Sequence, residues 1–225
     1  MYKLMVPLFA LIISFNTYAA KHYGTRLCSH PNYHCLTIQK DQSWLTLFPD
    51  ERQRDIVQRV NRINIELRAG MQLAIPDNLA RIDVLDVAPF AKQVPPLGKN
   101  NIIVNMKDLA WGAYNGAGEL VKWGPMSGGK NYCADVKRSC RTVKGDFTFY
   151  RKHGGGCKSS KYPIGKGGAP MPWCMFFHRG FAIHGSNTLP GYHASHGCVR
   201  VYPRDAHWLN TEFVKTGQTK IKIIP

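Results

Sequence analysis

The chain has 225 residues, enough for a medium-sized domain with its own core and a second, smaller one. With 44% apolar and 20% charged residues, its composition is that of a globular protein and excludes a largely disordered chain. The 30 Lys and Arg outnumber the 14 Asp and Glu and give a net charge of +16, which suits a protein that works in an anionic cell envelope. Nucleic-acid binding is disfavoured, because the sequence has no compact basic run with interleaved aromatic residues.

Residues 1–19 have the features of a secretory signal peptide. Lys3 supplies the positive start, residues 4–15 are mostly apolar, and residues 17–19 provide the positions that signal peptidase reads. The apolar stretch is well short of the roughly 20 residues that span a bilayer. We therefore expect cleavage after Ala19 or Ala20, export to the periplasm, and no membrane span in the mature protein.

Residues 20–78 predict a small α+β module. Residues 36–38 have strand character, and Asp50 is placed to cap a helix whose apolar side chains between Ile56 and Ile63 share one face. Residues 71–76 alternate like a short strand. This order, closing on AGMQLAIP at residues 69–76, resembles the LysM module, and KDQSW at residues 40–44 approximates that family's GDSLW turn. The resemblance implies binding to the glycan strands of peptidoglycan; the alternative is a small structural domain that orients the rest.

Residues 79–98, which contain several prolines, predict a linker, and residues 99–225 a mainly β domain. Strands are expected at residues 102–104, 109–114 and 119–121, with a glycine-rich turn at residues 115–118. Near the end, residues 205–214 predict one helix and residues 221–224 a closing strand.

Cysteines are informative in an exported chain, because disulfides persist there. An odd number leaves at least one thiol free, although six cysteines allow 15 pairings. Pairing of sequence neighbours is the simplest choice, because each pair then closes a loop rich in Gly, Pro, Asn or Ser. The predicted disulfides are Cys28–Cys35, Cys133–Cys140 and Cys157–Cys174, with Cys198 free.

Two segments carry the candidate chemistry. An apolar strand runs directly into His184, and Cys198 lies 14 residues later in SHGCVR. A cysteine, whose free pKa is about 8.5, needs a base or a positive environment to attack at neutral pH. Gly197 lets the backbone approach a substrate, amide groups at this turn could hold an oxyanion, and Arg200 offers a fork for a carboxylate.

These segments, HGS and SHGCVRV, resemble the signature of the L,D-transpeptidase catalytic domain, the YkuD-type β-sandwich. TVKGDF at residues 142–147 resembles its TPxGxF turn, and MPWCMFF at residues 171–177 resembles its MPYxMFF stretch. The resemblance runs from about residue 100 to the C-terminus. It implies a mainly antiparallel β catalytic domain. Carried over to this chain, the site residues are Cys198 as nucleophile, His184 as base, Gly185 orienting the imidazole through its carbonyl, and Ser195, His196, Gly197 and Arg200 beside the substrate.

The activity that this resemblance implies is cysteine-dependent transpeptidation on peptidoglycan tetrapeptide stems, without a cofactor or metal. The acceptor of the acyl group could be a diaminopimelate amine, a lipoprotein lysine or water, and water would make the enzyme an L,D-carboxypeptidase. Other interpretations are a non-catalytic peptidoglycan-binding protein, a papain-like hydrolase, in which the cysteine usually precedes the histidine, and a metal site. The residues of that metal site would be His184, His193, His196 and Cys198.

Overall fold

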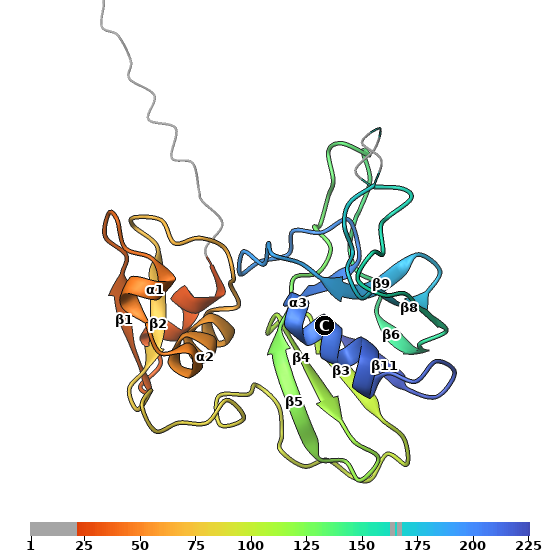
Figure 1. Cartoon of the computed structure of the whole chain (residues 1–225), viewed down its shortest axis with the longest axis horizontal. Helices are drawn as coiled ribbons and strands as arrows, with labels where there is room; N and C mark the ends of the chain where they lie inside the picture. Colours follow the sequence, from red (N-terminus) through yellow and green to blue (C-terminus); the bar gives the residue numbers. More distant parts are fainter. Residues whose placement is uncertain (1–21, 163–164, 166–167) are drawn as a thin grey trace, which may run out of the picture.

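The computed structural model describes residues 22–162, 165 and 168–225. The predicted signal peptide, residues 1–19, lies outside the described residues. A smaller N-terminal part and a larger β-rich part lie side by side and are joined by a strap along one edge (Figure 1). Within the described residues, no helix has the length and apolar character needed to cross a membrane.

The N-terminal part is an antiparallel strand pair covered by helices. Asp50 caps its longest helix, as predicted, by accepting the Gln53 N–H at 2.8 Å. Arg62 adopts a left-handed φ of 62° and ends that helix. The buried Ile63 therefore lies beyond the helix, whereas the sequence predicted it on the apolar face of the helix. The elements are η1 (Tyr23–Ser29), β1 (Tyr33–Thr37), α1 (Trp44–Leu47), α2 (Glu51–Asn61) and β2 (Gln72–Pro76).

The expected alternation along β2 is wrong, because its last four residues are all buried. Leu73 and Ile75 pack in one apolar cluster, and Ala74 packs in another with Ile56 and Val60 of α2. Asn61 ties the strand to the helix, since its amide accepts the Ala74 N–H and donates to the Ala74 carbonyl, both at 2.8 Å. Both faces of this short strand are therefore covered.

The larger part contains two sheets with the main core between them, which confirms the predicted mainly β class. The five-stranded sheet has the order β5-β4-β3-β11-β6, and the four-stranded sheet the order β10-β9-β8-β7. Most pairs are antiparallel, whereas β11–β3 and β10–β9 are parallel. The strands are β3 (Asn101–Asn105), β4 (Ala110–Tyr114), β5 (Leu120–Pro125), β6 (Gly145–Thr148), β7 (Arg151–Lys152), β8 (Met175–His178), β9 (Phe181–Gly185), β10 (Val199–Val201) and β11 (Lys220–Ile224).

The predicted C-terminal helix starts two residues earlier than expected. Pro203 begins α3 (Pro203–Trp208), consistent with the preference of proline for a first helical turn. The chain then continues into a wider π-helical turn, η2 (Leu209–Phe213), before β11. The helical segment thus spans nearly the residues that were predicted for it.

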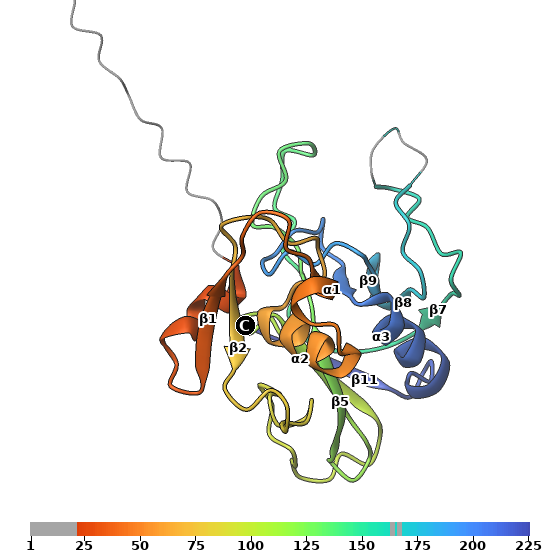
Figure 2. The same ribbon diagram turned by 60° about the vertical axis from the view of Figure 1, so that its left-hand side comes forward.

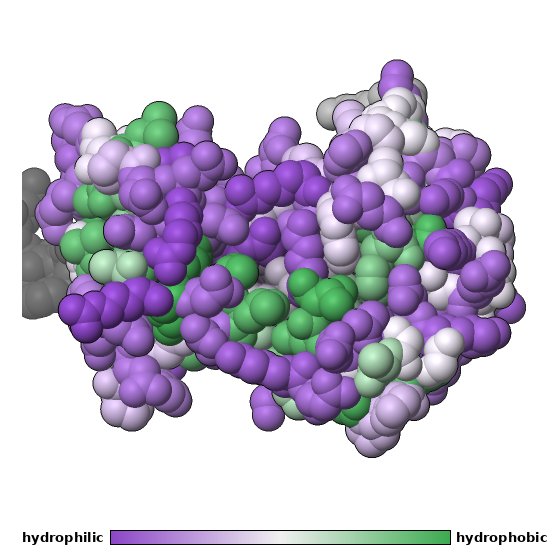
Figure 3. Space-filling view, turned by 60° about the horizontal axis from the view of Figure 1, so that its bottom comes forward, coloured by the Kyte–Doolittle hydropathy of each residue, from purple (hydrophilic) through white to green (hydrophobic). Residues whose placement is uncertain are grey.

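The predicted linker packs closely against the larger part. Trp123 donates its indole N–H to the Val84 carbonyl at 2.5 Å, and Tyr114 donates its hydroxyl to the Ala91 carbonyl at 2.8 Å. Apolar linker side chains, Phe90 among them, cover the buried side chains of β4 and β5. Figure 3 views this side, where apolar residues lie in the middle of a largely hydrophilic surface.

A buried ion pair joins the two parts. Arg59 of α2 donates to both carboxylate oxygens of Asp205 in α3, at 2.9 and 3.0 Å, and to the Trp123 carbonyl at 2.6 Å. The Arg59 and Asp205 side chains are 5% and 0% exposed. Nearby, the Tyr202 hydroxyl donates to the Ile63 carbonyl at 2.7 Å. The N-terminal part is therefore bound to the helix that follows β10.

Arg59→Ala is expected to destabilise the protein by about 3–5 kcal/mol, because the buried Asp205 carboxylate loses both hydrogen bonds from Arg59 and keeps only Lys122, at 4.0 Å, as a charged partner among the described residues. Lys92→Ala, which breaks the exposed pair with Asp86, should destabilise the protein far less, because solvent screens an exposed ion pair. Denaturant unfolding of both variants measures the difference. Equal costs would show that the buried pair contributes no more than a surface one.

The three predicted disulfides, Cys28–Cys35, Cys133–Cys140 and Cys157–Cys174, are all present. Cys198 is the free cysteine among the described residues. The second and third disulfides lie in two loops of the larger part, whose described residues rise as separate arms in Figure 2. Both loops contribute to the cleft described next.

Candidate active site

Two parallel strands bring His184 and Cys198 to the same face of the four-stranded sheet. Strand β10 pairs with β9 so that Val199 lies beside Ile183 and Arg200 beside His184. Ile183 and Val199 are fully buried in the main core. Because side chains alternate along a strand, the side chains of His184, Cys198 and Arg200 lie on the opposite face.

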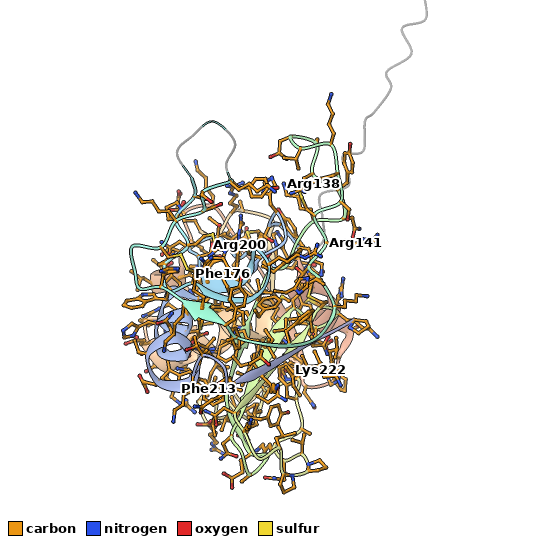
Figure 4. All side chains as sticks on the ribbon, turned by 90° about the vertical axis from the view of Figure 1, so that its right-hand side faces the viewer. Arg138, Arg141, Phe176, Arg200, Phe213 and Lys222 are labelled. Atoms are coloured by element: carbon orange, nitrogen blue, oxygen red, sulfur yellow. A yellow bond between two sulfur atoms is a disulfide. The ribbon has the colours of Figure 1, made fainter. Side chains whose placement is uncertain are left out.

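That face is the floor of a cleft of about 1290 Å³ lined by His184, Cys198, Arg200 and both disulfide-bonded loops. Figure 4 shows Arg138 and Arg141 at the same end of the molecule as Arg200, and Phe176 of β8 also lines the cleft. This volume is large enough for a peptide segment rather than a single ion.

His184 is held as a neutral imidazole whose Nε2 has no hydrogen-bond partner among the described residues. Its Nδ1 lies 2.9 Å from the Gly185 carbonyl oxygen, which can only accept, so Nδ1 carries the proton and Nε2 is left with a lone pair. Burial lowers the pKa of His184 to about 4, the Gly185 carbonyl opposes that shift, and the Arg200 charge adds to it. At neutral pH this imidazole can therefore accept a proton. Gly185 makes the contact expected of it.

Cys198 is a half-buried thiol that is protonated at neutral pH. Burial raises its pKa, while the Ala182 N–H and the Arg200 charge act in the opposite direction. The sulfur donates towards the Gly180 carbonyl at 3.6 Å. Within the described residues, the thiol makes no hydrogen bond to His184. The two groups share a face, and no hydrogen bond joins them in the described part of the chain.

The loop before Cys198 is internally bonded. Ser195 Oγ accepts the Gly197 N–H at 3.0 Å and donates to the Cys198 carbonyl at 2.6 Å. The Gly197 amide is thus bonded to Ser195 and is not one of the free amide groups of this turn that could hold an oxyanion, and the Ser195 hydroxyl braces the loop. Gly197 has a φ of 132°, and a Cβ there would lie 2.9 Å from the Phe181 ring, so only glycine fits.

Thr142 is a supporting residue to which sequence analysis assigned no role. Its hydroxyl donates to the Gly197 carbonyl at 2.8 Å and accepts the Gly129 N–H at 2.9 Å. It therefore joins the loop before Cys198 to the neighbouring backbone. Thr142 is the first residue of the TVKGDF segment, whose resemblance to the TPxGxF turn singled out this part of the chain without indicating the contact with Gly197.

His196 stands where the two disulfide-bonded loops converge. Its Nε2 lies 2.7 Å from Asp135 Oδ2, and its ring stacks on Tyr162 with centroids 4.8 Å apart. This hydrogen bond holds the pKa of Asp135 below its usual range. Asp135 and Tyr162 lie 61 and 34 residues from His196, so no local pattern could have identified them.

Arg200 extends its side chain along the cleft floor. Its Nη1 donates to Thr188 Oγ1 at a long 3.4 Å. The guanidinium therefore remains available to a carboxylate in the cleft.

The alternative metal site is not assembled. In the part of the chain that the structure describes, the one group of potential metal ligands comprises Cys133, Cys140 and His196, and its two sulfurs form a disulfide. His193 instead accepts the Gly128 N–H through Nδ1 at 3.2 Å. The four ligands considered from the sequence do not converge.

Comparisons with known proteins agree with this architecture. A solved L,D-transpeptidase (residues 123–326) from Xylanimonas cellulosilytica is 24% identical, with a TM-score of 0.55 over 76% of this chain and 78% of that one. One from Stackebrandtia nassauensis is 18% identical, with a TM-score of 0.48 over 61% of each chain. A search of curated protein sequences found no match. Residues 99–223, more than half of the chain, match the family described as the L,D-transpeptidase catalytic domain, YkuD, and the chain therefore belongs to that family.

Proposed function

We propose that the protein is a cysteine-dependent L,D-transpeptidase that acts on the tetrapeptide stems of peptidoglycan. One observation carries the proposal: a neutral, buried imidazole and a free thiol lie on one face of β9 and β10, at the floor of a large cleft. Family membership supports the reaction class.

In the proposed first step, the Cys198 thiol turns from the Gly180 carbonyl and transfers its proton to Nε2 of His184. The sulfur attacks the carbonyl carbon of the L-to-D peptide bond, and the C–N bond breaks as His184 returns the proton to the departing D-alanine amine. A thioester remains on Cys198. Both catalytic groups are uncharged at rest, so thiolate forms only during the attack.

In the second step, an amine of a diaminopimelate on another stem attacks the thioester and gives its proton to the thiolate sulfur through His184. The products are a cross-link and the restored thiol. We assign Arg200 to a substrate carboxylate because its fork is free in the cleft. His196 is assigned to the substrate channel, and Gly197 and Ser195 to shaping its floor.

Other acceptors lead to related reactions with the same residues. Water would give an L,D-carboxypeptidase, and a lipoprotein lysine would attach a protein to the wall. The test is to incubate exported, mature protein with sacculi, digest them and separate the muropeptides. Cross-linked products support transpeptidation, shortened stems support hydrolysis, and an unchanged profile would leave a non-catalytic wall-binding protein.

We further propose that residues 20–78 form a LysM-like module that binds glycan strands. The strand, helix, helix, strand order of this part and its antiparallel β1–β2 pair support the assignment. Glycan strands stripped of stem peptides should bind the full chain carrying Cys198→Ala. Failure to bind these strands while intact sacculi still bind would assign recognition to the cleft alone.

Asp135→Ala is expected to lower kcat/KM by about 2- to 10-fold, the loss of one positioning hydrogen bond, because His196 would lose its partner. Asp135→Asn, which can keep a hydrogen bond, should retain more activity. Acyl-enzyme formation on a tetrapeptide stem measures both. Asp146→Ala, an exposed carboxylate on β6, is the control and should match wild type. If Asp135→Ala were as active as wild type, the hydrogen bond between Asp135 and His196 would not contribute to the reaction.

A further inference from the structure

The cleft that contains Cys198 is lined by positive charge. Seven of its described lining residues are Lys or Arg, and none is Asp or Glu. The excess is local, because residues 130–200 contain twelve of the chain's 30 basic side chains and only two of its 14 acidic ones. A cleft lined by one sign of charge concentrates ligands of the opposite sign.

The charges come from both walls of the cleft. Arg138 and Arg141 lie in and beside the loop closed by the Cys133–Cys140 disulfide, and Lys158 and Lys161 lie in the loop closed by the Cys157–Cys174 disulfide. Figure 4 shows Arg138 and Arg141 near Arg200, with Lys222 towards the other end. A peptide lying over the thiol would therefore meet cations on two sides.

Several of these cations lie against aromatic rings. The Arg151 guanidinium lies 4.4 Å from the Phe176 ring centroid, and Arg138 and Lys161 lie 5.9 and 5.8 Å from that of Tyr162. None of the seven forms an ion pair with a carboxylate of the described residues. An aromatic face orients a cation and leaves its charge free for an anionic ligand.

We propose, resting on the function proposed above, that this cleft selects stem peptides whose carboxylates are free rather than amidated. A tetrapeptide stem carries carboxylates on its γ-linked glutamate, its diaminopimelate and its terminal D-alanine. Amidation of the first two removes two negative charges. Arg200, beside the thiol, meets the carboxylate closest to the scissile bond, and the cations of the two loops meet the others.

The test compares a free tetrapeptide stem with the same stem amidated at both positions. Binding is measured on Cys198→Ala, and acyl-enzyme formation on wild type. The free stem should be favoured about tenfold in both measurements at about 50 mM salt. Near 0.5 M salt the preference should narrow to about threefold or less, because exposed charges are screened.

The double variant Lys158→Gln/Lys161→Gln should lose most of the preference, whereas Lys220→Gln/Lys222→Gln, two exposed lysines on β11 outside the cleft, should keep it. Equal or better use of the amidated stem by wild type would overturn the inference and leave the proposed function standing. A binding preference without any acyl-enzyme would support the inference and overturn the proposed reaction. An absence of both binding and acylation would overturn both.

Discussion

Cys198→Ser is expected to abolish thioester formation and to lower acyl transfer by about 10³-fold or more, as the loss of a nucleophile that acts with its base typically does. A serine hydroxyl is a much weaker nucleophile, and the base assigned to it here is an imidazole whose pKa lies at about 4. The fold should remain, because the thiol makes one long hydrogen bond, to the Gly180 carbonyl. Intact-mass detection of the acyl-enzyme on a tetrapeptide stem measures the loss.

Thermal unfolding of Cys198→Ser and Cys198→Ala provides the control for folding. Both variants should unfold close to wild type, and iodoacetamide should label the unreduced wild-type protein once, at Cys198, since the other six cysteines are paired. Labelling should be slow at neutral pH, because burial raises the pKa of the thiol. An acyl-enzyme of equal extent on Cys198→Ser would place the nucleophile on another residue.

Local patterns predicted the elements and the cysteine pairing well. The Asp50 cap, the apolar runs that form β3 and β4, and the three disulfides, which close loops of 7, 7 and 17 residues, depend on residues near each other in the chain. The β2 pattern misled because two clusters cover both faces of that strand. Alternation is informative only when one face is exposed.

Contacts between distant residues could not be predicted in this way. Arg59 and Asp205 are 146 positions apart, and Asp135 meets His196 only because the disulfide-bonded loop folds back over the sheet. The use of the Gly197 amide by Ser195 depends on the exact turn of the backbone. Sequence motifs therefore indicated the candidates His184 and Cys198 and the Gly185 carbonyl beside the imidazole, whereas the contacts made by Thr142, Ser195 and Asp135 required the fold.

The pH dependence of kcat/KM should have its acidic limb near pH 4 rather than near 6.5. Burial and the Arg200 charge disfavour the imidazolium, so the neutral base persists until the pH falls to the lowered pKa of His184. The thiol, whose pKa is raised, adds no ionisation below its usual range. Steady-state rates on a tetrapeptide stem should therefore be flat from about pH 5 to pH 8. His184→Ala should lower them by about 10²- to 10⁴-fold at every pH.

His34→Ala, which removes an exposed histidine paired with Asp77, is the control and should leave the profile unchanged. An acidic limb between pH 6 and 7 would instead indicate that His184 titrates near the ordinary pKa of histidine. If His184→Ala left alkylation of Cys198 unaffected and His196→Ala slowed it, the roles of the two histidines would be exchanged.

The stability of the protein gives an independent measurement of the pKa of His184. Between pH 6.5 and 4, His184 binds a proton in the unfolded chain but not in the folded protein. Lowering the pH from 6.5 to 4 should therefore reduce the free energy of unfolding by about 3 kcal/mol more in wild type than in His184→Ala.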